Sequence, residues 1–430
     1  MPGSGRQPIN APAGARDASG VPWIGLGILL VLILILAAFV AYFFFDVGAD
    51  SGDGPITQLG SSQPAPDGSV GGELGGASVS SLGFPVVATR NTSRIAGSDP
   101  VQISIAAALA AYPTTGPGTP PAAVTIVNAD QWHAGVVAAS LSSPPVGSPI
   151  LLAPTGTLSE EGLAALRQFD PTGSPTTGEN RVFAIGKVAP PPDFEVKQVG
   201  GADPARLAAN VAALKADLDG GPPDAFVVVS SEDPEFASPA ATWAARSGDV
   251  VLFTGTDEVP KATIDVLEDE ANADVPIFVL GPPEAVSAAA LKVIDEAGGT
   301  VERVAGSDPV DNALELVRYS SGAFGWNLND PGHGFTVARA DRPMDVIAAT
   351  ALSTGGTWPA LLLTDSASTL PEAVGDYLMD VKPGYDTDPT AALYNRVWII
   401  GDETLIDVDQ QAVIDDLAEL VPVETLNSTP

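Results

Sequence analysis

The chain has 430 residues, enough for two or three domains, and 45% of them are apolar, so it can bury sizeable cores. It carries 53 acidic and 19 basic residues, a formal net charge of −34, which argues against nucleic acid as a partner because phosphate backbones are bound by clustered Lys and Arg. With no cysteine and only two histidines, it lacks the residues for disulfides, thiolate metal sites, a cysteine nucleophile or a multi-histidine metal centre.

The N-terminal segment predicts a membrane anchor. Residues 1–20 have the composition of a disordered tail, and residues 21–45 form an uninterrupted uncharged run. The apolar part of this run would be roughly 35 Å long as a helix, enough to cross a hydrocarbon core of about 30 Å. Trp23 and Tyr42 lie near its ends, where interfacial aromatic residues are expected. The alternative is a cleaved signal peptide, whose apolar region is normally only about 7–15 residues.

The flanking charges predict the orientation of this anchor. Arg6 and Arg16 precede the apolar run, and no further basic residue follows until Arg90. The positive-inside rule then places the N-terminus in the cytoplasm and the rest of the chain outside the cell, as a single-pass protein of the cell membrane. Residues 46–84 include 20 Gly, Ser or Pro among 39 residues, which predicts a flexible linker.

From about residue 85 the sequence repeats itself three times. Gly97, Gly201 and Gly306 are spaced by 104 and 105 residues, and each is followed two residues later by an Asp-Pro pair. Asp is a good helix N-cap and Pro suits the first helical position, so each pair predicts the start of a helix. The preceding glycine is expected to permit a sharp exit from a strand.

Each repeat also contains apolar runs typical of buried strands. They fall at residues 124–127, 150–152 and 182–186; 226–229, 250–253 and 277–281; and 335–337, 361–364 and 397–401. Continuous apolar strands that alternate with helices indicate parallel sheets covered by helices. The predicted fold class is α/β, with three tandem modules at residues 85–194, 195–299 and 300–425.

The repeated sequence motifs resemble those of a known family. It comprises R-[IV]-A-G-S-D at Arg94 and Arg303, an Ala-rich aromatic segment, a Leu-Leu strand and a strand ending in [IV]-x-G. Residues 90–425 are similar to the bacterial cell wall-binding repeat 2 family. The resemblance implies three modules packed around a pseudo-threefold axis, and non-covalent attachment to anionic wall polymers of Gram-positive bacteria. The sequence departs from the family pattern at Gln198, which replaces the expected Arg, and only the third module keeps the acid of the aromatic segment, Asp345.

Six residues are therefore candidates for polymer binding. They are Arg94, Asp99, Asp203, Arg303, Asp308 and Asp345. The planar fork of an arginine suits phosphate or carboxylate, although pairing with the neighbouring Asp is the alternative for both arginines. For the three motif aspartates, helix capping is the main alternative to ligand contact.

Other chemistry finds little support in the sequence. His133 beside Trp132 is expected in a loop at the carboxyl end of a strand, either at a ligand or partly buried, and His333 is expected in a turn. Nucleophile-elbow, Walker and dinucleotide fingerprints do not occur, so no enzymatic activity is predicted. The acidic pairs at 386 and 388 and at 407 and 409 do not fit a calcium loop. We expect no metal site and no cofactor, although divalent cations could bridge carboxylates to a polymer.

These observations predict a membrane-anchored extracellular protein that binds the cell wall. Its partner would be an anionic cell-wall polymer or a peptidoglycan-associated glycan of the cell envelope. The alternative is a ligand-sensing or scaffold ectodomain that keeps the fold but binds a small molecule or a protein. Three modules in one chain can close a threefold ring internally, so a monomer is expected.

Overall fold

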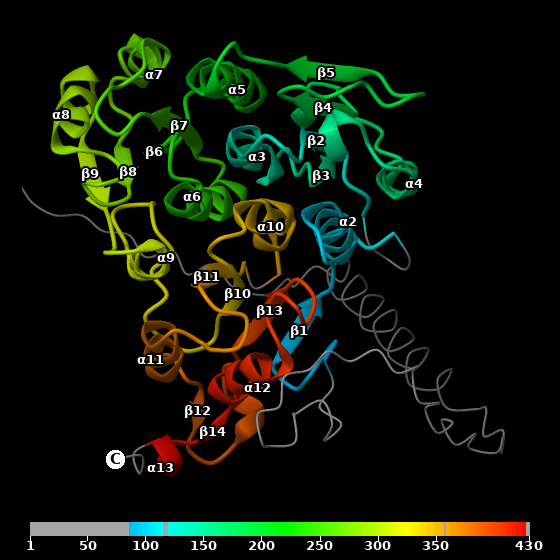
Figure 1. Cartoon of the computed structure of the whole chain (residues 1–430), viewed down its shortest axis with the longest axis vertical. Coiled ribbons are helices and arrows are strands. Elements are labelled where there is room, and N and C mark those ends of the chain that lie inside the picture. The colour runs from blue at the N-terminus through cyan, green and yellow to red at the C-terminus, as the bar shows by residue number, and fades with distance from the viewer. Residues whose placement is uncertain (1–85, 115–118, 357, 427–430) are drawn as a thin grey trace, which may run out of the picture. The chain divides into compact units, whose positions relative to one another are not determined.

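The computed structural model describes residues 86–114, 119–356 and 358–426 (Figure 1). They form three four-stranded parallel sheets covered by helices, so the predicted α/β class is confirmed. Within these ranges no helix has the length and apolarity needed to cross a bilayer. The predicted anchor at residues 21–45 lies outside the described residues.

The first sheet has the order β3-β2-β4-β5. Its strands are β2 (Val124–Asn128), β3 (Ile150–Ala153), β4 (Val182–Ile185) and β5 (Val196–Val199). Its helices are α2 (Pro100–Ala111), α3 (Trp132–Ala138) and α4 (Glu160–Phe169). Strands β2, β3 and β4 are buried at every position, as their continuous apolar sequences predict.

The second sheet repeats this order as β7-β6-β8-β9. Its strands are β6 (Phe226–Ser230), β7 (Val250–Thr254), β8 (Ile277–Leu280) and β9 (Val301–Val304). Its helices are α5 (Pro204–Asp219), α6 (Pro234–Ser247), α7 (Lys261–Leu267) and α8 (Ala288–Ala297).

The third sheet has the order β11-β10-β13-β1. Its strands are β10 (Gly334–Arg339), β11 (Ala360–Thr364), β13 (Arg396–Ile400) and β1 (Thr92–Ile95). The remaining helices are α9 (Pro309–Arg318), α10 (Pro343–Ala348), α11 (Glu372–Asp380), α12 (Val408–Leu417) and α13 (Val423–Leu426). A small pair joins β12 (Gly384–Tyr385) to β14 (Val421–Pro422). Short 3-10 helices are η2 (Ala139–Ser142), η3 (Pro154–Gly156), η4 (Pro175–Thr177), η5 (Glu270–Asn272), η6 (Thr350–Thr354) and η7 (Pro389–Ala391).

The strand that opens each sequence repeat lies in the sheet of another repeat. Strand β5 pairs with β4, β9 pairs with β8, and β1 pairs with β13, with Thr92 opposite Val397. The first strand of the described chain therefore completes the last sheet. Each repeat is joined to the next by main-chain hydrogen bonds as well as by side-chain packing.

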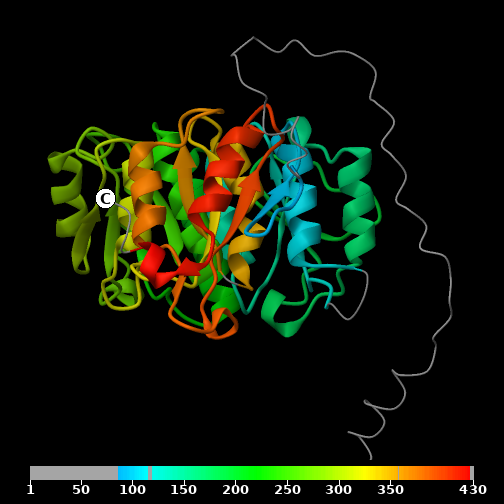
Figure 2. The same ribbon diagram turned by 90° about the horizontal axis from the view of Figure 1, so that it is seen from below.

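Helices α3, α6 and α10 connect the three sheets. Each contacts the other two, and one cluster of buried apolar residues extends over all three sheets (Figure 1). In the view of Figure 2 the helices run alongside the strands that they cover. The apolar core is thus shared between the repeats, so each repeat buries part of its surface against its neighbours.

The Asp-Pro pairs start helices, as the sequence predicts. Asp99 Oδ1 accepts from the amides of Val101 (2.9 Å) and Gln102 (3.0 Å) at the start of α2. Asp203 and Asp308 accept in the same way from residues 206 and 311, at 2.8 and 2.9 Å. The capping alternative is therefore confirmed for all three motif aspartates.

The glycine before each Asp-Pro pair is needed for a different reason from the one expected. None of the three has a positive φ. Instead, a Cβ at Gly306 would lie 2.2 Å from the amide nitrogen of Asn312, and a Cβ at Gly201 would lie 2.3 Å from that of Leu207. The backbone of the first helical turn comes so close to the glycine that no side chain fits.

A buried carboxyl group lies at the start of the second sheet. Asp249 is 3% exposed and accepts hydrogen bonds from Trp243 Nε1 (2.6 Å) and the amide of Ala225 (3.1 Å). Burial is the largest influence on this group, and it raises the pKa of Asp249 from 3.8 to about 6. The nearby Asp224 acts in the same direction, while the hydrogen bonds partly oppose the rise.

This group should make stability depend on pH. The folded state holds the Asp249 proton more tightly than the unfolded chain, so its contribution is present below pH 4 and is lost as the pH rises to about 6. Relative to Asp249→Asn, the free energy of unfolding of the wild type should fall by about 2 kcal/mol between these limits. Urea denaturation of both proteins from pH 4 to pH 8 measures this difference, and parallel profiles would contradict it.

Candidate functional site

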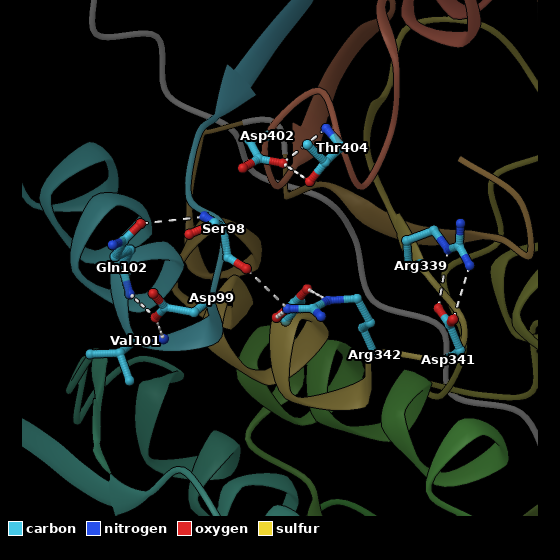
Figure 3. A network of polar contacts seen from close by, with 10 residues as sticks. Ser98, Asp99, Val101, Gln102, Arg339, Asp341, Arg342, Asp402 and Thr404 are labelled. Atoms are coloured by element: carbon cyan, nitrogen blue, oxygen red, sulfur yellow. Dashed lines mark hydrogen bonds and ion pairs between the residues drawn. The ribbon is translucent and has the colours of Figure 1, made fainter. Parts of the chain in front are cut away.

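The carboxyl ends of parallel strands are the usual ligand-binding edge of an α/β sheet, at the point where the strand order reverses. In the third sheet this point lies between β10 and β13, because β10 is followed in the chain by β11 on its other side. The loops after β1, β10 and β13 all emerge at this edge, and their polar side chains approach one another (Figure 3). We call this edge the Arg342 edge.

Charged side chains of the Arg342 edge come from three segments that are far apart in the sequence. At the end of β10, Arg339 forms an ion pair with Asp341 at 2.9 Å (Figure 3). After the strand, Arg342 forms an ion pair with Asp345. Arg342 Nη2 also lies 3.5 Å from the carbonyl oxygen of Ser98, which precedes α2. After β13, Asp402 accepts from the amide (2.9 Å) and hydroxyl (2.6 Å) of Thr404.

Asp345 positions Arg342 instead of facing solvent. It is 2% exposed in the first turn of α10, and its carboxylate holds the guanidinium of Arg342. Burial raises the pKa of Asp345, and the ion pair with Arg342 partly opposes this rise. The same hydrogen bond raises the pKa of Arg342. The predicted ligand residue Asp345 is therefore buried, and the cation presented at this edge is Arg342, which is about one-third exposed.

Sequence reasoning missed Arg342. The signal that could have found it is its position just before the helix that carries Asp345. The residues at the N-cap of the corresponding helices are Gln131 before α3 and Asp233 before α6. Only the third of these helices is preceded by a cation, so this edge differs chemically from the other two.

Arg94 is buried within the protein. Arg94 is 6% exposed, and each of its three guanidinium nitrogens donates to at least one acceptor. Nη1 donates to the carbonyl oxygens of Gly401 (2.9 Å) and Asp402 (3.0 Å), and Nε and Nη2 donate to Gln411 Oε1 at 3.1 and 2.6 Å. Nε also donates to the Val86 carbonyl at 3.2 Å. Its partners are carbonyl and amide oxygens and not the neighbouring Asp, and the side chain is buried rather than presented to a ligand.

The same contact recurs at the two equivalent positions. Arg303 Nη1 donates to the carbonyl oxygen of Gly281 at 2.5 Å, and Gln198 Nε2 donates to that of Gly186 at 2.8 Å. In each repeat, this side chain therefore donates to the carbonyl oxygen of the glycine that follows the neighbouring strand of the same sheet. Arg303 also donates to the Val286 carbonyl at 2.7 Å. This structural role explains why glutamine can replace arginine in the second repeat.

The two histidines lie in different settings. His133 is in the first turn of α3, not in a loop, and its Nε2 lies 2.8 Å from the carbonyl oxygen of Ser231. It stacks on Trp132 at 3.7 Å, and burial lowers its pKa. His333 precedes β10, with Nε2 3.0 Å from Asp330. In the described part of the chain, no group of three or more His, Asp or Glu residues is placed to hold a metal ion.

The predicted acidic pairs contain helix caps. Asp388 Oδ1 accepts from the amide of Thr390 at 2.9 Å, and Asp407 Oδ1 accepts from that of Gln410 at 2.8 Å. These two carboxylates are thus used in local structure.

The architecture, three linked four-stranded parallel sheets, is shared with solved structures. Cwp6 from Clostridium difficile is similar with a TM-score of 0.59 and 17% identity, over 76% of this chain and 48% of that one. Cwp8 from the same organism has a TM-score of 0.58 and 17% identity, over 77% and 52% of the two chains. The chain spans about half of each, and at this identity the likeness shows the fold alone.

Sequence comparisons give no match. No model of a known protein family matches the chain. No curated protein is significantly similar to it. The resemblance to the cell wall-binding repeat 2 family therefore stays a prediction, which the shared fold supports.

Proposed function

We propose that the chain is a cell-envelope protein that binds anionic wall polymer non-covalently. Its three modules would lie around a pseudo-threefold axis, and residues 21–45 would hold it in the cell membrane with the modules outside. The observation that carries this proposal is the fold, which the chain shares with two cell wall proteins of Clostridium difficile. The triple repeat in the sequence supports it independently.

The net charge restricts how such binding can work. With 53 acids and 19 bases, the chain as a whole repels a polyanion, although salt screens this repulsion over about 8 Å at physiological ionic strength. Attachment must then depend on local sites. The Arg342 edge supplies a partly exposed guanidinium held by Asp345, and a guanidinium fork suits phosphate or carboxylate.

Divalent cations offer a second route. Asp341, Asp99 and Asp402 surround the same edge, and carboxylate oxygens are the ligands that calcium and magnesium prefer. A cation that bridges one of these carboxylates to polymer phosphates would bind without requiring a basic surface. The two routes differ in their response to a chelator.

Co-sedimentation of the full chain, purified in mild detergent, with isolated Gram-positive walls tests the proposal. We expect retention that moderate salt does not abolish, unlike the steep fall shown by a basic binder. Arg342→Gln should weaken retention about tenfold if the guanidinium binds polymer, whereas EDTA should abolish it if cations bridge. Lys292→Gln removes one exposed charge elsewhere and is the matched control.

Two outcomes would overturn the proposal. If the chain does not sediment with walls at any salt, with or without calcium, wall binding is contradicted. The alternative, a ligand-sensing or scaffold ectodomain, would then be favoured. Protection of residues 90–430 from protease added to intact cells would contradict the proposed membrane orientation.

A further inference from the structure

A cavity lies at the end of the third sheet opposite to the Arg342 edge. It has a volume of about 360 Å³, within the range of about 300–1,000 Å³ typical of small-molecule sites. Ser93 of β1 and Arg396 and Trp398 of β13 line one side, and the end of α2 and Thr354 of η6 line the other. Because these strand residues lie at or near the amino ends of β1 and β13, the cavity is separate from the Arg342 edge.

The charge of this cavity is opposite to that of the chain. Its described lining residues include no carboxylate, and its one charged side chain is Arg396. Arg396 is exposed and donates through Nη1 to the carbonyl oxygen of Arg90 at 2.5 Å. No carboxylate forms an ion pair with it in the described part of the structure. In a chain with 53 acidic residues, this cavity therefore has a lining that contains a cation and no carboxylate.

The ring of Trp398 is partly exposed in this cavity, whereas the equivalent aromatic rings of the other two sheets are buried. Trp398 is paired with Ser93, and the equivalent pairs are Phe183 with Lys197 and Phe278 with Glu302. Phe183 is fully buried. Phe278 is 2% exposed and lies under the ring of Phe324 at 3.8 Å. Trp398 is only half-buried, and it lines the cavity.

The corresponding cavity of the second sheet shows what has changed. It is smaller, about 210 Å³, and is lined by Phe278 together with the carboxylates of Asp224, Asp249 and Glu302. An anion would be repelled there. In the third sheet, the acid of β9, Glu302, is replaced by Ser93 of β1 at the paired position, and the cavity is larger.

We propose that the cavity between Arg396 and Trp398 binds an acidic sugar unit of an anionic glycan. The Trp398 ring offers a flat, amphipathic surface to a sugar ring, and the Arg396 fork offers paired donors to its phosphate or carboxylate. The hydroxyl of Ser93 lies at the same wall of the cavity. This inference rests on the proposed function and adds to it a second contact, at the opposite edge from Arg342.

Matched variants of the full chain test this inference. Arg396→Gln should weaken both retention on isolated walls and binding of glucose 1-phosphate or glucuronate about tenfold, with glucose as the neutral reference. Arg396→Lys keeps the charge without the fork and should be intermediate. Trp398→Leu should weaken binding of the charged sugars and of glucose alike. Comparison of the two acidic sugars distinguishes phosphate from carboxylate as the preferred group.

Arg181→Gln is the matched control. Arg181 stands at the equivalent position of the first sheet, next to Val182, which pairs as Val397 does. Its guanidinium pairs with Asp170 at 3.4 Å and lies over the ring of Phe194. We expect its loss to leave wall and sugar binding unchanged. Urea midpoints of all variants show whether a loss of binding reflects a loss of folding.

The outcomes separate the two proposals. Retention of wild type on walls with no effect of Arg396→Gln or Trp398→Leu on walls or sugars would overturn the cavity inference and leave the proposed function standing. Sugar binding that depends on Arg396 without wall retention would support the cavity and overturn the wall function. No binding to either probe would overturn both.

Discussion

Replacement of Arg94 with alanine should lower the free energy of unfolding by about 3–5 kcal/mol. The substitution removes every bond from the buried guanidinium and leaves the carbonyl oxygens of Gly401 and Asp402 and the amide oxygen of Gln411 without this donor. Each buried acceptor without a partner costs about 1–3 kcal/mol. Urea denaturation followed by circular dichroism measures the change.

Gln198→Ala is the control for this prediction. It removes the equivalent side-chain bond, to the Gly186 carbonyl, from a residue that is exposed. Water can replace this donor, so the loss should be about 1 kcal/mol or less. Similar losses of unfolding free energy for the two variants would contradict the argument that burial makes the hydrogen bonds of Arg94 more stabilising.

Replacement of Gly306 with alanine should destabilise the protein by about 3 kcal/mol or more. The added Cβ would lie 2.2 Å from the amide nitrogen of Asn312 and the carbonyl carbon of Asp311, both main-chain atoms of α9. The first turn of α9 would have to move, and with it the cap that Asp308 forms at 2.9 Å. Yield of soluble protein and the urea midpoint measure the effect.

Two other glycines calibrate this result. At Gly97 the nearest atom to an added Cβ is Cγ1 of the Ile103 side chain, at 2.9 Å, so alanine there should be less harmful. At Gly200 no atom lies within 4 Å of an added Cβ, so alanine should change stability by at most about 0.5 kcal/mol. Equal effects at residues 200 and 306 would contradict the close-approach argument.

Much of the fold could be predicted because its signals are local. The buried strands are short apolar runs, and the Asp-Pro pairs start helices through contacts within a single turn. The exchange of the first strand of each repeat could not be predicted, because nothing in the sequence near Thr92 indicates a partner at Val397. Spacing establishes that a unit repeats, but not which sheet each of its strands joins.

The candidate site was harder to predict because its chemistry depends on burial. Arginine suits both an anionic ligand and a set of carbonyl oxygens, and only the tertiary structure shows that Arg94 has the second role. Asp345 was selected as the acid that matches the family pattern, yet it is buried and holds Arg342. Trp398 and Arg396 lie in a repeated apolar strand that the sequence marks only as buried, and only comparison of the three sheets draws attention to them.

The pairing of β1 with β13 also fixes an order of events during synthesis. Strand β1 leaves the ribosome first among the described strands, and β13 follows roughly 300 residues later. At about 5–20 residues per second, β1 waits on the order of 15–60 s for its partner while the first two sheets can already form. An unpaired strand invites pairing with other chains. Strand β1 is only four residues long and carries the charge of Arg94, two features that discourage such pairing until the end of the chain arrives.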